Sequence, residues 1–218
     1  MLNTKKGTFY EKNFLSHGEL IKDISNQNIP QVVLKGHLHI ERALENIIRE
    51  SFENPNLLLT EKSMFSNKLS LVSALGIVPH EYTVALKYFN KIRNKFSHDL
   101  EFKLEEEELA QLVNRLDSKT KEFYEGLLRQ DTPEEDEYMR YISLFPYKLM
   151  FVVISLFVKL IEYHRSYLTD PIVEELFKLH ILKKEILGKD EDFQKAYIDD
   201  RYNELEKTLH IFYEENLK

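Results

Sequence analysis

The chain has 218 residues, a formal net charge of −7 and no cysteine. The lack of thiols excludes disulfide bonds, thiol catalysis and thiolate metal sites. Acidic side chains concentrate after residue 100, so the composition disfavours a basic DNA-binding surface over the whole molecule but leaves room for a local basic cleft in the first half.

The composition favours helices over strands. There are only 6 glycines and 6 prolines, no Asn-Gly pair marks a hairpin, and Leu, Glu, Lys and Ile dominate. The longest apolar run, Leu149–Val158, falls short of the roughly 20 residues that span a bilayer. The first fifteen residues also lack the apolar core of a signal peptide. We therefore expect an all-α protein that is cytoplasmic and makes no membrane contact.

Apolar residues at intervals of three and four predict a series of helices along the chain. After a tail at 1–13, the expected helices cover 14–26, 31–53, 65–75, 79–98, 105–116, 119–129 and 138–168, followed by one that begins at Asp170-Pro171 and one that contains residues 198–212. Ile29-Pro30 is expected to break the chain before the first long helix, and Gly76 to end the third helix in a left-handed conformation.

The candidate domain boundaries lie in the second half of the chain. The stretch DTPEEDE at 131–137 is the best internal linker candidate, and the helix after it is apolar almost all round from Leu144 to Ile161. Pro146 is expected to kink this helix or to mark its start. We predict a tail at 1–13, a helical domain at 14–168, and a C-terminal helical pair at 169–218 packed on the same domain.

The stretch with the most chemical character is YTVALKYFNKIRNKFSH, residues 82–98. Its apolar side chains fit one buried helix face, and Lys87, Lys91, Arg93 and Lys95 lie in a window without an acid. This local reversal of charge suits an anionic ligand. An Arg guanidinium offers a donor fork to phosphate oxygens, and an imidazole moves protons near neutral pH.

Helical geometry supports this interpretation only in part. Asn94 and His98 are four residues apart and share a face, whereas Arg93 and His98 point about 140° apart on a straight helix. They converge only if the helix unwinds near Ser97 or if a second copy of the chain brings its own set across a two-fold axis. The plain structural alternative is that Arg93 pairs with an acid and His98 caps its own helix.

Three stretches together carry a family resemblance: LKGHLHIERALENIIRESF at 34–52, FSNKLSLVSALGIVPHEY at 65–82 and LKYFNKIRNKFSHDLEF at 86–102. These stretches resemble the HEPN superfamily of small helical proteins, and in particular its mannitol-operon-repressor-like branch. Their order along the chain and the distances between them also fit this branch. The resemblance covers roughly residues 31–165 and implies a HEPN-like antiparallel helical bundle, with the helices after residue 170 as an addition.

The resemblance also implies a function. Active HEPN proteins are endoribonucleases that need no metal or cofactor, work as dimers with facing motifs, and leave a 2′,3′-cyclic phosphate. Carried over, the motif gives Arg93, Asn94 and His98 as catalytic residues, with Lys91 and Lys95 binding the RNA backbone. Such a protein is expected to be a toxin or a phage-defence effector, with an antitoxin or a regulatory protein as partner.

Two other functions remain open at this point. The mannitol-repressor likeness also suits a non-catalytic transcriptional regulator or interaction module, and a nucleotide-binding HEPN domain is a third hypothesis. His37 and His39 lie about 200° apart on their helix, which makes a shared metal improbable. The apolar stripe around His37 predicts a core or interface residue, with a position near the motif as the alternative.

Overall fold

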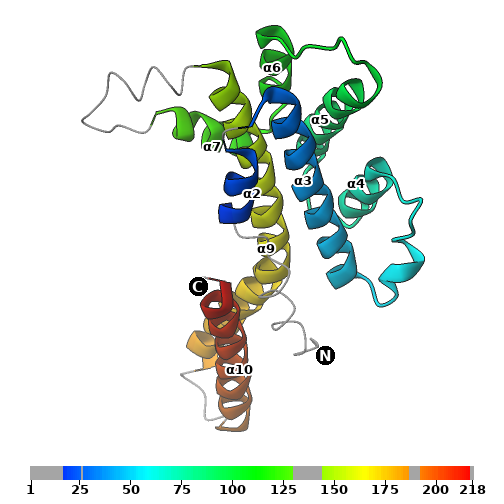
Figure 1. The fold of residues 1–218 in the computed structure, drawn as a ribbon. Helices are drawn as coiled ribbons and strands as arrows, with labels where there is room; N and C mark the ends of the chain where they lie inside the picture. The colour runs from blue at the N-terminus through cyan, green and yellow to red at the C-terminus, as the bar shows by residue number, and fades with distance from the viewer. Residues whose placement is uncertain (1–16, 26, 130–143, 187–191, 217–218) are drawn as a thin grey trace. The chain divides into compact units, whose positions relative to one another are not determined.

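The computed structural model describes residues 17–25, 27–129, 144–186 and 192–216 (Figure 1). Every regular element in these ranges is a helix, so the predicted all-α fold is confirmed. The elements are α2 His17–Ile24, α3 Ile29–Ser51, the 3₁₀ turn η1 Pro55–Leu57, α4 Phe65–Ala74, α5 His80–His98, α6 Glu106–Val113, α7 Ser118–Leu128, α9 Phe145–Ile186 and α10 Asp192–Asn216. The predicted tail at 1–13 and linker at 131–137 lie outside the described residues.

The helices divide into two compact units, Leu15–His164 and a second unit that includes Arg165–Lys218. We call them the helical body and the C-terminal pair. The division falls within α9, a few residues before the boundary at 168/169 that the sequence suggested. No helix among the described residues has the length and apolarity needed to cross a membrane.

Helix α3 organises the helical body, because it contacts α2, α4 and α5 (Figure 1). The predicted break at Ile29-Pro30 is wrong: α3 begins at Ile29, with Pro30 in its first turn. The side chain of Asn28 accepts a hydrogen bond from the Gln31 N–H at 3.0 Å and caps the helix. A proline is tolerated there because first-turn N–H groups have no partner within the helix.

The N-terminal part of α9 packs closely against α3. A Cβ atom added to Gly36 would lie 2.4 Å from Cγ1 of Val153, far inside van der Waals contact. The α9 residues Val152–Val158 are all buried, as the apolar run predicted. The helix starts at Phe145, so Pro146 marks its first turn rather than a kink in its middle.

Helix α5 follows α4 after a short turn. Gly76 has a φ of 72°, which confirms the predicted left-handed end of α4. Six side chains of α5 are buried in the body: Tyr82, Thr83, Ala85, Leu86, Phe89 and Ile92. The Tyr82 hydroxyl donates a hydrogen bond to the Leu156 carbonyl of α9, which satisfies the polar end of this fully buried ring.

The C-terminal pair consists of the end of α9 and of α10. The sequence predicted a new helix starting at Asp170-Pro171, and this is wrong: α9 continues from Phe145 to Ile186 with Pro171 inside it. Leu168, Ile172 and Leu176 keep helical spacing across the proline, which removes one backbone donor. The pair has its own small core, formed by Ile172, Leu179, Ile198 and Leu205, with Leu176, Tyr202 and Leu209 packed against it.

Candidate functional site

The two sides of α5 have different roles. Its apolar side is held in the body, and the helix is fixed to α6 by the Tyr88 hydroxyl, which donates to Gln111 at 2.9 Å. The Arg115 guanidinium lies over the Tyr88 ring, 4.2 Å from its centroid. These contacts set the orientation of the opposite side of the helix, which carries the basic residues.

Four polar residues follow one line along the outward side of α5: Lys87, Lys91, Asn94 and His98. We call this set the α5 stripe. Its spacings of four, three and four keep all four positions within one face of a helix. Lys87, Lys91 and His98 are exposed and Asn94 is half-buried. Lys87, which the site prediction omitted, therefore accompanies Lys91, which it included.

Arg93 does not lie on the α5 stripe. Helix α5 is continuous through Ser97, whose hydroxyl donates to the Arg93 carbonyl, so the expected alternative that the helix unwinds there is wrong. Within a single chain, Arg93 and His98 thus stay about 140° apart around the axis. Helix α5 keeps its helical hydrogen bonds to its end, because the Asp99 N–H donates to the Lys95 carbonyl in the last turn.

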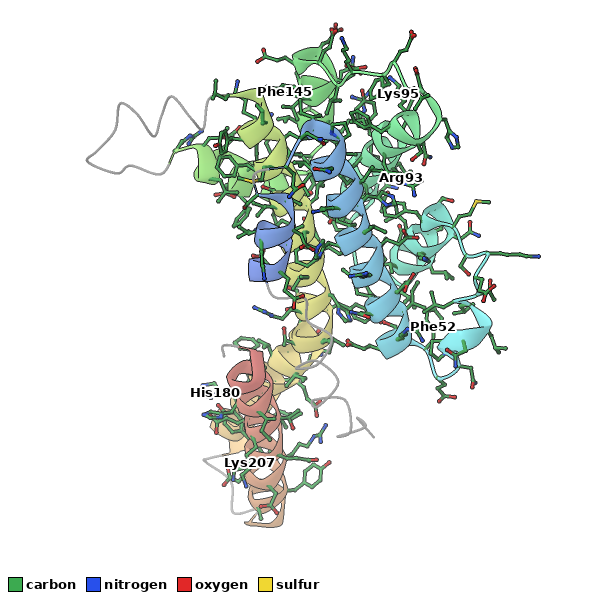
Figure 2. All side chains as sticks on the ribbon, viewed as in Figure 1. Phe52, Arg93, Lys95, Phe145, His180 and Lys207 are labelled. Atoms are coloured by element: carbon green, nitrogen blue, oxygen red, sulfur yellow. The ribbon has the colours of Figure 1, made fainter. Side chains whose placement is uncertain are left out.

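The Arg93 side chain reaches back to the α5 stripe through its neighbour. Its Nη1 donates a hydrogen bond to Oδ1 of Asn94 at 3.1 Å. Among the described residues, no carboxylate forms an ion pair with Arg93, in contrast to the structural alternative in which it pairs with an acid. Figure 2 labels Arg93 and Lys95 on this helix. The guanidinium keeps further N–H donors for a ligand.

Lys95 has a different environment from Lys91. Its ammonium lies 3.3 Å from Oε1 of Glu108 and 4.7 Å from the centroid of the Phe102 ring. Phe102 in turn contacts Phe96 edge to face. The Lys95 charge is therefore partly neutralised by α6, whereas the exposed Lys91 and Lys87 present theirs to solvent.

A cleft of about 850 Å³ opens beside the end of α5. Its lining residues come from α5, the following loop and α6: Lys95, Leu100, Glu101, Phe102, Lys103, Glu105, Glu107, Glu108 and Gln111. Carboxylates outnumber ammonium groups here, so the cleft repels a phosphate chain. Leu100 is fully exposed at its edge. An anionic ligand would therefore lie along the α5 stripe and not in this cleft.

His37 of α3 meets α5 one turn before Asn94. It is 2% exposed, its Nε2 lies 2.9 Å from Oδ1 of Asn90, and its ring stacks on Phe65 at 4.4 Å. Burial lowers the pKa of His37, and the charges of Arg93 and Lys68 act in the same direction. In this contact Nε2 is the donor, because an amide oxygen only accepts. The predicted core position of His37 is confirmed.

Asn90 is the residue that the sequence analysis missed. It precedes Asn94 by four residues and His98 by eight, so the series of polar residues at this interval was the available signal. Its side chain faces α3, whereas His98 is exposed at the helix end. Asn90 thus connects the buried His37 to the helix that carries the candidate motif.

The two histidines of α3 serve different contacts. His39 Nε2 lies 2.8 Å from Oδ2 of Asp23 on α2, and its ring meets Phe157 of α9 edge to face. His37 faces α4 and α5 instead. The two imidazoles therefore do not converge on one ion, and no group of three His, Asp or Glu residues in the described part of the chain has the arrangement of a metal site.

A buried lysine ties α4 to α3 close to His37. The Lys68 ammonium donates to Glu41 at 2.7 Å and to Glu45 at 2.5 Å. Burial works against the charge, but the two carboxylates outweigh it and leave the pKa of Lys68 above its usual value. This contact holds Phe65, at the start of α4, against the His37 ring.

Comparisons with known proteins give no further guide. No family model matches the chain, and neither a curated protein nor a solved structure matches it significantly.

Proposed function

We propose that the protein is a HEPN-type, metal-independent endoribonuclease that acts as a dimer, as a toxin or a phage-defence effector. The observation that carries the proposal is the arrangement at the end of α5, where Arg93 donates to Asn94 and Asn94 shares an exposed face with His98. A guanidinium, an amide and an imidazole supply charge, orientation and proton transfer at a phosphodiester.

The α5 stripe suits a polyanionic substrate. Lys87 and Lys91 are exposed on the same side as Asn94 and His98, and they lie about two turns and one turn before Asn94. Ammonium groups at this spacing neutralise phosphates without contacting bases. Lys95 is proposed to contribute less to RNA binding, because the nearby Glu108 carboxylate partly neutralises its charge.

The chemistry calls for a second copy. The ribose 2′-hydroxyl attacks phosphorus while a base removes its proton, the P–O5′ bond breaks, and an acid donates a proton to the departing oxygen. The products are a 2′,3′-cyclic phosphate and a 5′-hydroxyl, so atoms balance without a metal or an oxidant. With Arg93 and His98 on different sides of a continuous α5, facing motifs from two protomers supply base, acid and guanidinium together.

The test is cleavage of an end-labelled RNA in the presence of EDTA, with analysis of the product ends. His98→Ala is expected to lower the rate by about 10²–10⁴-fold. The matched control is His80→Ala, which removes the other exposed terminal histidine of α5 and is expected to retain the wild-type rate. Arg93→Ala is expected to lose activity and Arg93→Lys to recover only part of it, since a lysine lacks the planar fork.

A folded wild type that leaves the RNA intact, or a His98→Ala variant that cuts at the wild-type rate, contradicts the proposal. The first result would favour a second candidate, a non-catalytic regulator or interaction module of the mannitol-repressor-like kind. The cleft at the end of α5 is the observation in its favour, since exposed Leu100 and a majority of carboxylates suit a basic protein segment.

A further inference from the structure

Two asparagines of α5, Asn90 and Asn94, are held in the same way. The amide oxygen of Asn94 accepts a hydrogen bond from Arg93, and that of Asn90 lies 2.9 Å from Nε2 of His37. Both oxygens are thus engaged by donors of the protein itself. The two amide nitrogens have no hydrogen-bond partner among the described residues. Each side chain therefore keeps an unused N–H donor.

The imidazole that holds Asn90 is fixed by its surroundings. His37 is buried, and its ring lies against that of Phe65, with the ring centroids 4.4 Å apart. Its second nitrogen, Nδ1, lies 3.8 Å from the carboxylate of Glu41, which is itself paired with Lys68. A side chain held by such a group has lost its rotamer freedom before a ligand binds, so Asn90 adds little ordering cost to binding.

The amide nitrogen of Asn90 lies on the side of α5 that carries the motif. Asn90 is half-buried, and its amide nitrogen, unlike Nδ1 of His37, is not enclosed away from solvent. The oxygen and nitrogen of a planar amide point in different directions, so an oxygen held by a core residue turns the nitrogen outward. Asn94 follows four residues later, about 6 Å further along the axis and about 40° round it. The unused donor of Asn90 therefore lies one turn before the pair of Arg93 and Asn94.

The charges around this donor favour an anion. The charged side chains within three residues of Asn90 on α5 are all basic: Lys87, Lys91 and Arg93. In the described part of the chain, none of the three forms an ion pair with a carboxylate. Phosphate oxygens accept from amide, ammonium and guanidinium donors alike. The side chain of Asn90 thus suits a phosphate that lies next to the one at the candidate motif.

We propose that Asn90 is a further RNA-binding residue of the candidate site and that His37 is its positioning residue. The amide nitrogen of Asn90 donates to a phosphate oxygen, one turn before the phosphate that Arg93 and Asn94 hold, while His37 keeps the amide turned towards the RNA. This role rests on the proposed ribonuclease, because it takes the same RNA as substrate. It assigns substrate binding, without proton transfer, to a residue outside the motif.

The first experiment measures binding of a labelled single-stranded 2′-O-methyl RNA, which lacks the attacking hydroxyl and is therefore bound without being cut. Asn90→Asp keeps the oxygen that His37 contacts but replaces the donor with a negative charge, and it is expected to weaken binding by about 100-fold. Asn90→Ala loses the donor alone and is expected to weaken binding by about 10-fold. The matched control is Asn67→Asp, which makes the same change at an exposed residue of α4 and is expected to bind like the wild type.

The second experiment separates KM from kcat for cleavage of the unmodified RNA in EDTA. Asn90→Ala is expected to raise KM by about 10-fold with kcat almost unchanged, whereas His98→Ala is expected to lower kcat. His37→Gln keeps an N–H donor for Asn90 and is expected to retain most of the affinity for RNA that His37→Leu loses.

The third experiment reads the Asn90 amide directly and needs no change in the core. The side-chain amide protons of Asn90 are identified in the NMR spectrum of the wild type as the pair that is missing from Asn90→Asp. These signals are expected to shift when the 2′-O-methyl RNA is added, and the signals of Asn67 are expected to stay in place.

The inference is overturned if Asn90→Asp binds the 2′-O-methyl RNA like the wild type, if the Asn90 signals do not respond to RNA, or if Asn90→Ala alters kcat and not KM. Wild-type affinity in His37→Leu overturns the positioning role. If the wild type cuts RNA while Asn90→Asp binds normally, only this contact fails. If the wild type binds RNA through Asn90 but cuts none, the ribonuclease fails and the contact stands. A wild type that binds no RNA overturns both.

Discussion

The helical body and the C-terminal pair use polar side chains in different ways. In the body, buried polar groups join separate helices: His37 meets Asn90, Lys68 meets Glu41, and the Tyr163 hydroxyl donates to Asp117 at 2.5 Å. In the pair, charged side chains meet at the surface, as in the exposed contact of Lys178 with Glu174. Buried polar contacts therefore fix the helices of the body relative to one another, whereas the two helices of the pair are held mainly by apolar contact.

Truncation of core residues is expected to give the largest effect and to separate the two regions. Phe89→Ala removes a fully buried ring of the body and should lower its free energy of unfolding by about 3–5 kcal/mol. Leu205→Ala should instead destabilise the C-terminal pair, with the body unchanged. Hydrogen exchange resolved by peptide measures both. Equal loss of protection in α5 and α10 for both variants would contradict the contrast.

A glycine pair tests close packing within the body. Gly36→Ala places a methyl group against Val153 and should cost about 1–3 kcal/mol. Gly126→Ala, in α7, meets nothing within 4 Å and should stabilise by about 0.5–1 kcal/mol, because alanine loses less conformational freedom in a helix. Thermal unfolding of the two variants gives the comparison, and the same sign for both would rule out the packing argument.

Ion pairs in the body and in the C-terminal pair should differ in their effect on stability, by less than the core residues do. Lys68→Met leaves Glu41 and Glu45 close together without their cation and should cost about 1–2 kcal/mol. Lys178→Met breaks an exposed pair in α9 and should leave the denaturant midpoint nearly unchanged, because solvent screens the two charges. Denaturant midpoints measure both values. A loss as large for Lys178→Met as for Lys68→Met would remove the distinction between the two regions.

The smallest expected effect is a pH dependence in the body. Burial lowers the pKa of His37 in the folded chain below its usual value of 6.5. As the pH falls below 6.5, His37 is therefore protonated in the unfolded chain before it is protonated in the folded one. Stability should therefore decline from pH 7 towards the lowered folded pKa, and His37→Gln should flatten this part of the curve. Identical slopes for the wild type and the variant would show that His37 does not contribute.

Helix periodicity and turn residues were sufficient to predict most of the fold. The apolar stripe around His37 predicted the buried face of α3, which includes Ile40, Leu44 and Ile48, and Gly76 correctly marked the end of α4. The prolines misled in two places, because Pro30 and Pro171 both lie inside helices. A proline shows that one backbone donor is missing, but tertiary packing decides whether the helix continues.

The candidate site was only partly accessible from sequence. The shared face of Asn94 and His98 follows from their spacing, and the structure has both on α5. The contact of His37 with Asn90 joins residues 53 positions apart, and the burial of Lys68 depends on carboxylates from another helix. Such contacts arise from the packing of α3 against α4 and α5, which local patterns do not specify. The catalytic roles of Arg93, Asn94 and His98 stay a prediction.

Because α9 passes from one unit into the other without a linker, the C-terminal pair has no natural point of excision. A chain shortened at His164 would end in the middle of a helix, and the last four carbonyl groups of the new terminus would lose their partners. Such a fragment would test helix fraying together with the loss of the pair. A point substitution in the core of the pair, such as Leu205→Ala, is thus the cleaner way to separate the contributions of the two units.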